Sequence, residues 1–221
     1  MDAEPGLRER KKLETRHRLG EVAARLFAER GYDAVAVSDV ARAADVSDQT
    51  VYNYFPTKPE LVLDRAEEML ERSRRVVAER ASADTPADGI RLLVHEDIDR
   101  FRGADPAVAR GEFPAQCLTS GPLRRYALEF RSGQADAIAH AIVETDPEVP
   151  FLVALAHASA LVAIIQSITD RIGAAIVADT GRDAAAKKMR RDADAAFADA
   201  AENFRSTVSR ARRPGSVRGS T

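Results

Sequence analysis

The sequence is poor in the residues from which disulfides and many catalytic sites are built. Its one cysteine, Cys117, can form neither a disulfide within the chain nor a cysteine-rich zinc site. His95 and Glu96 begin the zinc-protease motif HExxH, but the fifth position is Asp99, so the motif is incomplete. A GxSxG nucleophile elbow and a glycine-rich phosphate loop are also missing. We therefore expect a protein without enzyme activity, bound metal or cofactor.

Apolar segments that could direct or anchor a protein are scarce as well. The first residues, MDAEPGLRERKK, contain no apolar signal segment. The longest apolar stretch, residues 149–168, reaches transmembrane length but contains His157, Ser159 and Gln166. Its many alanines favour a helix that is buried in a protein. We expect a cytoplasmic protein with no membrane contact.

A strong overall charge is also lacking, since the formal net charge is −2 and residues 1–58 carry ten basic and ten acidic side chains. Basic residues are nevertheless concentrated locally. Residues 8–18 contain six of them, including Lys12 and Arg16, against two glutamates. Such a cluster can contact a phosphate backbone, and a solvated basic segment is the alternative. A second arginine-rich cluster lies near the C-terminus, where we expect residues 214–221 to be a disordered tail.

Residues 37–58, VSDVARAADVSDQTVYNYFPTK, have the pattern of two short helices joined by a tight turn. Ser38 and Ser47 stand where their hydroxyls can cap the first and the second helix. Two short helices with such a turn form a helix-turn-helix unit. In that unit the second helix enters the major groove of DNA with its N-terminal end first.

The side chains of the second helix suit contact with DNA. Gln49 and Asn53 are four residues apart, so a helix places both amides on one face, where each can bond N6 and N7 of an adenine. The alternative is a three-helix packing unit with exposed amides. Residues that can instead contact phosphates, which position the protein without reading sequence, are Thr50, Tyr52, Tyr54 and Lys58.

Residues 8–58 as a whole resemble the tetracycline-repressor (TetR) family of bacterial transcription regulators. The matching segments are ETRHRLGEVAARLFAERGY, VSDVARAADVS and TVYNYFPTKPEL. The last of them is the most specific, because it combines Tyr52 and Tyr54 with Phe55 and Lys58. One departure is Gln49, at a position where small residues are common in the family. The operator sequence therefore cannot be inferred from relatives.

The resemblance implies an all-α fold of about nine helices. A three-helix helix-turn-helix domain is expected over residues 1–58, followed by an effector-binding and dimerisation domain over residues 59–213. The implied protein is a homodimer that binds a palindromic double-stranded DNA operator and is released by an unknown small-molecule effector. The alternative is a helical DNA-bound protein that is gated by a protein partner.

Apolar residues recur at helical spacing along the chain, and no strand-like alternation is sustained. We expect Gly31 to end the first helix, Pro86 to begin another, and one short helix to contain Phe113. A single helix is expected from Lys58 to about Arg80. Two long helices, over residues 150–178 and 183–208, are expected to form the dimer, with Phe197 and Phe204 in the interface. The alternative is that they complete the core of the protomer.

Asp97 is the main candidate for contact with an effector. It lies on the same predicted helix stripe as Ile90, Val94 and Phe101, where an unpaired carboxylate is unfavourable. Asp97 could bond a ligand in an apolar pocket, or it could pair with an arginine such as Arg124 or Arg125. The full set of candidate ligand residues, each of which could equally be plain core, is Asp97, Phe101, Phe113, Tyr126, Phe130, His157 and Gln166.

Overall fold

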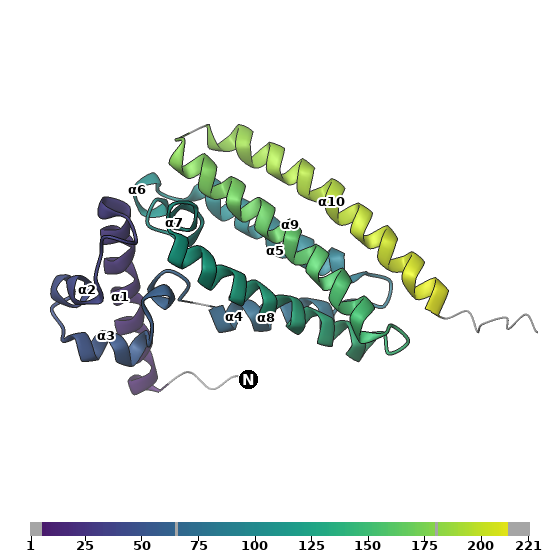
Figure 1. Ribbon diagram of the computed structural model, residues 1–221, viewed down its shortest axis with the longest axis horizontal. Helices are drawn as coiled ribbons and strands as arrows, with labels where there is room; N and C mark the ends of the chain where they lie inside the picture. Colours follow the sequence, from purple (N-terminus) through teal and green to yellow (C-terminus); the bar gives the residue numbers. More distant parts are fainter. Residues whose placement is uncertain (1–5, 65, 180, 212–221) are drawn as a thin grey trace, which may run out of the picture. The chain divides into compact units, whose positions relative to one another are not determined.

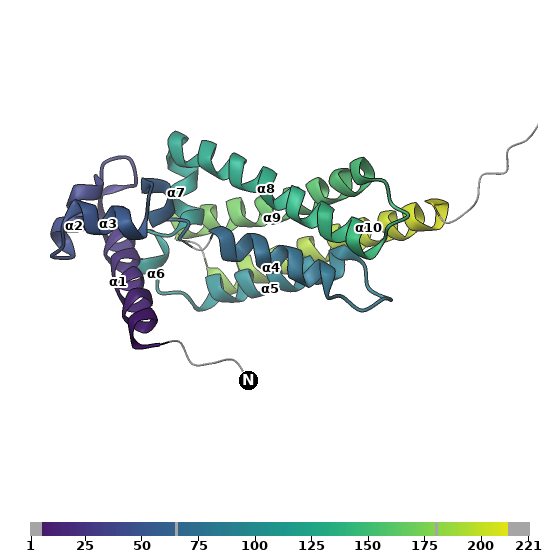
Figure 2. The ribbon, with the colours of Figure 1, turned by 90° about the horizontal axis from the view of Figure 1, so that it is seen from below.

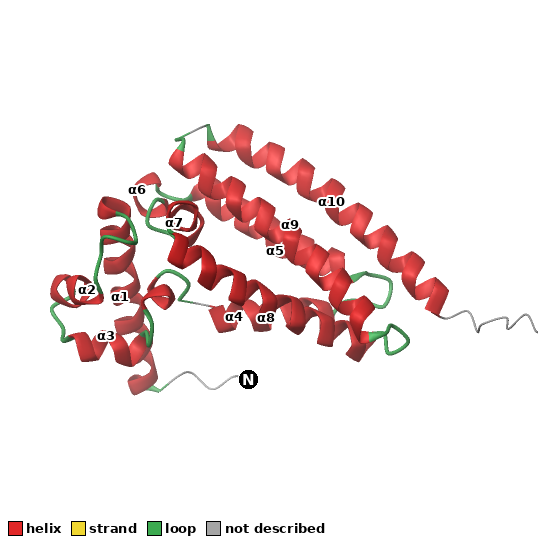
Figure 3. Cartoon of the chain, in the orientation of Figure 1, coloured by secondary structure: helices red, strands yellow, loops and turns green. Residues whose placement is uncertain are grey.

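The computed structural model describes residues 6–64, 66–179 and 181–211. Within these ranges the chain forms helices joined by loops and turns, and no strand occurs (Figure 1, Figure 3). The all-α fold is therefore confirmed, whereas the expected tail over residues 214–221 lies outside the described residues. The helices are α1 (Leu7–Arg30), α2 (Val37–Ala43), α3 (Asp48–Tyr54), the 3-10 turn η1 (Lys58–Leu61), α4 (Ala66–Ala78), α5 (Pro86–Gly103), α6 (Pro106–Ala109), α7 (Phe113–Thr119), α8 (Gly121–Thr145), α9 (Phe151–Val177) and α10 (Arg182–Ala211).

Several helix ends follow from local sequence. Gly31 ends α1 with a φ of 80°, in the region that favours glycine, and its N–H donates to the carbonyl of Phe27. Pro86 begins α5, as expected. The two prolines Pro106 and Pro114 each stand in the first turn of a short helix, so the segment expected to hold one short helix holds two, α6 and α7.

The expectation of one helix from Lys58 to about Arg80 was wrong. The chain forms η1 over Lys58–Leu61 and resumes a helix only with α4 at Ala66. Thr57 precedes η1 in extended conformation, and Pro59 lies in its first turn. Because proline has no N–H and fixes its own φ, it suits a helix start and lacks one of the hydrogen bonds of a continuing helix. The segment after the second helix of the helix-turn-helix pattern is therefore a separate short turn.

The chain is organised in two compact units that do not coincide with the expected boundary after residue 58. Of the described residues, the first unit contains those within 1–66, 103–127 and 170–182, and the second contains those within 67–102, 128–169 and 183–221. The first unit thus contains the helix-turn-helix segment together with α6, α7, the start of α8 and the end of α9.

The core of the first unit is built around α1. Leu19, Ala23 and Phe27 recur every four residues on this helix and are buried, facing Val40 of α2 and Val51 of α3. The three helices lie together in both ribbon views (Figure 1, Figure 2). The same hydrophobic cluster includes residues from later in the chain, namely Cys117, Leu123 and Ala127.

Two glycines allow close helix approach on either side of α7 within the first unit. A Cβ atom on Gly111, just before α7, would lie 1.8 Å from the carbonyl oxygen of Ala24 in α1. A Cβ atom on Gly173 of α9 would lie 2.1 Å from the carbonyl oxygen of Pro114 in α7. Both distances are impossible for a side chain. The segment that carries α7 is therefore held against α1 and against the end of α9 by backbone contact.

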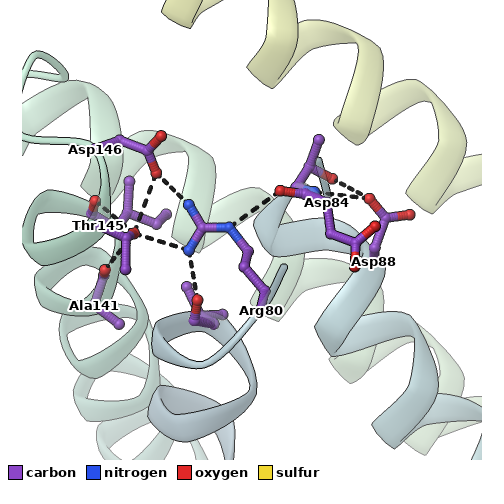
Figure 4. A network of polar contacts seen from close by, with 9 residues as sticks. Arg80, Asp84, Asp88, Ala141, Thr145 and Asp146 are labelled. Atoms are coloured by element: carbon purple, nitrogen blue, oxygen red, sulfur yellow. Dashed lines mark hydrogen bonds and ion pairs between the residues drawn. The ribbon is translucent and has the colours of Figure 1, made fainter. Parts of the chain in front are cut away.

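The second unit contains a buried polar network that joins the ends of α4 and α8 (Figure 4). The guanidinium of Arg80 contacts the carboxylate of Asp146 and donates to the hydroxyl of Thr145 at 2.8 Å and to the carbonyl of Asp84 at 3.2 Å. The side chains of Arg80 and Asp146 are 7% and 13% exposed. Removal of one partner of such a buried pair generally destabilises a protein by about 3–5 kcal/mol.

Helix α10 packs inside the second unit through its phenylalanines. Phe197 and Phe204 are 1% and 5% exposed in the protomer, and the ring of Phe204 lies 4.8 Å from that of His157 in α9. The expectation that these phenylalanines form the dimer surface was therefore wrong. The periodicity identified the apolar face of α10, but another helix of the same protomer covers it.

Candidate nucleic-acid interface

Helix α2 begins before Ser38, the residue that was expected to cap it. Ala36 is the N-cap residue, and its N–H donates to the carboxylate of Asp39 at 2.9 Å. Ser38 is therefore the second residue of the helix and not its cap, which corrects the expected capping role. Asp45 adopts a φ of 54° in the turn, and the N–H of Val46 donates to the carbonyl of Ala41 at 3.0 Å. These bonds close α2 and redirect the chain into α3.

Ser47 caps α3, as predicted. Its Oγ accepts from the N–H of Thr50 at 3.1 Å and lies 2.8 Å from the hydroxyl oxygen of Thr50. The Thr50 hydroxyl is consequently held at the N-terminal end of α3. An open hollow of about 540 Å³ lies beside this end, lined by Ser38, Arg42, Asp45, Val46, Ser47 and Asp48.

The two amides of α3 lie together on an exposed face. Gln49 and Asn53 are both exposed, whereas Val51 between them is fully buried. The amide nitrogen of Gln49 donates to the side-chain oxygen of Asn53 at 3.0 Å. Tyr52 is 45% exposed on the same short helix. Helix α3 thus places the amide donors and acceptors of Gln49 and Asn53 side by side at the protein surface.

Arg16 has its guanidinium directed into the first unit rather than toward solvent. It donates to the carbonyls of Tyr54 and Asp64, the latter at 2.6 Å, and lies 4.4 Å from the centre of the Phe55 ring. These contacts satisfy the planar donor group and its π face. Through these contacts α1 holds the C-terminal end of α3, and the phosphate contact of Arg16 stays a prediction. The local cluster of basic residues did not indicate these contacts, because Tyr54 and Asp64 lie 38 and 48 positions after Arg16 in the sequence.

Lys58 and Tyr32 form a second junction within the first unit. The ammonium of Lys58 lies 4.1 Å from the centre of the Tyr32 ring, which in turn lies 5.3 Å from the Phe27 ring. Burial raises the pKa of Tyr32 to about 12, and Asp33 acts in the same direction. Burial lowers the pKa of Lys58, whereas the Asp33 carboxylate opposes that change. Lys58 is thus only half-exposed and packs on the protein's own aromatic ring.

The remaining candidate DNA contacts differ in exposure. Lys12 is exposed on α1, and Tyr54 is half-buried at the end of α3. Arg42, which the sequence reasoning missed, is 78% exposed on α2 and lies 3.3 Å from Asp39. A basic residue on the outer face of the first helix of the pair was the signal that could have identified it.

The candidate ligand residues are divided between the two units. Phe113 and Tyr126 belong to the first, and the other five belong to the second. Asp97 is 38% exposed and lies 3.4 Å from Arg100, so its arginine partner is neither Arg124 nor Arg125. Burial raises the pKa of Asp97, while Arg100 and Arg72 act in the opposite direction.

His157 is the most unusual of these candidates. Its Nε2 is buried and has no hydrogen-bond partner among the described residues. Burial, helped by the positive charge of Arg80, lowers the pKa of His157 to about 4. Of the other candidates, Phe101 is buried, and Phe130 and Gln166 are half-buried. Within the described part of the chain, no cluster of three or more His, Cys, Asp or Glu side chains could hold a metal ion.

The first unit also contains a smaller hollow beneath the end of α1. Its volume is about 240 Å³, and it lies between the C-terminal end of α1, the α6–α7 segment and the end of α9. Gln116 is buried at its edge. The lining residues are Phe27, Ala28, Gly31, Arg110, Ala115, Gln116, Thr119 and Val177.

Comparison with known proteins agrees with this helix-turn-helix geometry. Residues 19–64 match the family model of bacterial regulatory proteins of the tetR family. The chain is 28% identical over 101 residues to the HTH-type transcriptional regulator TcmR of Streptomyces glaucescens, an alignment that covers 46% of this chain and 45% of TcmR. It is 25% identical over 120 residues to the HTH-type transcriptional regulator YuxN of Bacillus subtilis, covering 50% of this chain and 40% of YuxN. The chain thus matches less than half the length of these relatives.

The likeness in fold extends further along the chain. The structure of the transcriptional regulator FadR from Bacillus subtilis, in complex with stearoyl-CoA, superposes with a TM-score of 0.55 and covers 84% of this chain and 97% of that one, at 18% identity. Helix α2, the tight turn and the capped α3 with its exposed amides together form a helix-turn-helix unit. Residues 19–64 are therefore similar to the DNA-binding segment of the tetR family of bacterial regulatory proteins.

Proposed function

We propose that the protein is a cytoplasmic homodimeric repressor that leaves a palindromic operator when it binds a small molecule. The observation that carries this proposal is the geometry of α3, which is capped by Ser47 and presents Gln49 and Asn53 together at the surface. In this proposal the two amides read base edges, and Ser38, Ser47, Thr50, Tyr52, Tyr54, Lys12 and Lys58 face the phosphate backbone.

The exposed face of α9 supports the homodimer. In its most apolar 18-residue window, only 28% of the residues are buried in the protomer. One stripe of exposed apolar and small residues runs along the helix, consisting of Leu152, Ala156, Ala160, Ala163 and Ser167. Small residues allow two helix backbones to approach closely. A second copy packed on this stripe would cover it and would place two α3 helices on one palindrome.

Helix α9 also has the length and composition of a transmembrane span, so a lipid contact is the competing explanation of the stripe. The protein contacts on its other side favour a water-soluble dimer. Phe204 of α10 packs on His157 of α9, and α10 exposes charged residues such as Lys187, Lys188 and Arg191. A long helix that exposes such charges would be costly to place in hydrocarbon.

The proposal is tested by selection of bound sequences from random double-stranded DNA with the full-length protein. We expect a palindrome whose half-site centres lie about one helical turn apart, roughly 34–36 Å. Sedimentation of the complex should give two protomers per duplex. Recovery of sequences without two-fold symmetry, or a stoichiometry of one, would contradict the homodimer.

The effector is tested separately, because DNA binding does not depend on its identity. Stearoyl-CoA is a rational first probe, since the FadR structure of similar fold contains it. Release of a labelled operator by stearoyl-CoA, but not by free coenzyme A, would support an apolar effector. If operator release instead requires a protein from the native host and is unaffected by small molecules, the partner-gated alternative is correct.

A further inference from the structure

Helix α7 holds the connection between α1 and α2 through a buried glutamine. Gln116 is 7% exposed, and its side-chain oxygen accepts from the N–H of Tyr32 at 2.7 Å. Its amide nitrogen donates to the carbonyl of Phe27 at 3.0 Å and to that of Arg110 at 2.6 Å. One side chain, 84 residues from Tyr32 in sequence, thus completes the hydrogen bonding at the C-terminal end of α1.

The start of α8 adds a second contact to the same connection. Ser120 is 3% exposed, and its hydroxyl donates to the carboxylate of Asp33 at 2.6 Å. The same oxygen accepts from the N–H of Leu123 at 3.2 Å. Two neighbouring residues, Tyr32 and Asp33, are therefore held at once, one by its backbone and the other by its side chain.

Tyr32 also contacts the segment that follows α3. The Tyr32 ring lies under the ammonium of Lys58, and Lys58 begins η1, the next element after α3. The α1–α2 connection is thus fixed on one side by α7 and α8 and on the other by η1. Gln116 and Ser120 thus contact the connection that leads from α1 to α2 and α3.

We propose that Gln116 and Ser120 are positioning residues for operator binding, which rests on the proposed function of α3. They touch no base or phosphate. They restrict the α1–α2 connection to one conformation, so that α3 is already oriented when DNA arrives. Without Gln116 and Ser120 the α1–α2 connection adopts several conformations. Only the fraction of molecules in the conformation that orients α3 correctly can then bind DNA. The operator affinity falls, while the contacts that read sequence remain the same.

The most direct test changes Asp33, the exposed hydrogen-bond partner of Ser120, because substitutions there leave the hydrophobic core intact. Asp33→Ala removes the acceptor for Ser120 together with a negative charge near the DNA-binding helices. Charge alone would make this variant bind DNA more tightly. The proposal requires the opposite, a dissociation constant about tenfold higher. Asp33→Asn keeps an acceptor and removes the charge, so it should bind no more weakly than the parent.

Gln116→Leu and Ser120→Ala complete the experiment in the full-length chain. Each should weaken operator binding about tenfold with an unchanged salt slope and unchanged base preference, and amide exchange over residues 31–36 should become faster. The double variant Asp33→Ala with Ser120→Ala should bind like either single variant. The matched control is Gln134→Leu, since Gln134 is equally buried in the second unit and donates to Ser73 at 2.9 Å. It should lower the melting temperature without changing operator affinity.

The results distinguish failure of the proposed function from failure of the positioning role of Gln116 and Ser120. If the parent protein selects no DNA, the proposed function fails. If the parent binds and Asp33→Ala, Ser120→Ala and Gln116→Leu bind equally tightly, the positioning role is wrong. A reduced salt slope in Ser120→Ala would also overturn it, because that result indicates a direct phosphate contact.

Discussion

The amides of Gln49 and Asn53 are bonded to each other in the free protein, at 3.0 Å. A base that bonds one of them must share or replace that bond. The pair therefore acts as one recognition group, in which each amide orients the other. Loss of either side chain leaves its neighbour free to rotate on the exposed face.

This coupling gives a prediction for operator binding. Gln49→Ala and Asn53→Ala should each weaken binding by about 1–3 kcal/mol, and the double variant should lose less than the sum. The measurement is a double-mutant cycle of operator dissociation constants, with nonspecific DNA as a control whose affinity stays constant. Strict additivity would show that the two amides act on separate bases without coupling.

His157 makes stability depend on pH. Because burial and Arg80 lower its pKa to about 4 from the ordinary 6.5, the folded protein keeps the ring neutral while the unfolded chain binds a proton below about pH 6.5. The contribution of His157 to the free energy of unfolding is thus fully present above about pH 6.5 and is lost as the pH drops toward 4. The loss is about 3 kcal/mol at the lower limit.

Urea unfolding at pH 7, 5 and 4 measures this effect. His157→Gln removes the titrating group and should flatten the dependence between pH 6.5 and 4. Exposed carboxylates contribute equally to both proteins and serve as the internal reference. Identical pH dependence in parent and variant would place the acid sensitivity elsewhere.

At the scale of helices, Arg16 joins α1 to the end of α3 through two carbonyls and the Phe55 ring. Arg16→Lys keeps the charge but loses the planar donor group. We expect Arg16→Lys and Arg16→Met to lose similar stability, about 1–3 kcal/mol, and to bind operator similarly weakly. Thermal unfolding and the salt dependence of binding test this. A lysine variant that binds like the parent, beside a methionine variant with a reduced salt slope, would restore Arg16 as a phosphate contact.

The exposed stripe of α9 gives a prediction for the formation of the homodimer. Ala160→Glu and Ala163→Glu place a charge on its exposed stripe and should yield monomers that bind operator poorly. Ala83→Glu, at an exposed loop position between α4 and α5, should leave the oligomeric state unchanged. Sedimentation velocity distinguishes the three variants. Dimers in all of them would move the interface away from α9.

Local spacing was sufficient to predict some of these elements. The Ser47 cap, the end of α1 at Gly31 and the shared face of Gln49 and Asn53 all depend on residues within a few positions of each other. Contacts distant in sequence were not predictable in this way. The inward direction of Arg16 depends on carbonyls far along the chain, and an apolar stripe such as that of Phe197 does not reveal which surface will cover it.

At the scale of the whole molecule, the compact units are not continuous in sequence. The first unit combines three segments, 1–66, 103–127 and 170–182. Helices α8 and α9 each supply residues to both units. A boundary drawn after residue 58 from the helix-turn-helix pattern therefore separates residues that pack together, such as Phe27 and Cys117 of one hydrophobic cluster.

The three-segment composition of the first unit limits how this protein can be recombined with its relatives. A chimera that takes only residues 1–66 from another regulator would present a foreign Tyr32–Asp33 connection to Gln116 and Ser120, and a foreign α1 to Gly111. Such a chimera can lose these contacts, so we expect it to bind the operator of the grafted helices more weakly. If α3 reads DNA as proposed, we expect the whole first unit to be the portable module, so that sensors built from this scaffold should exchange all three of its segments.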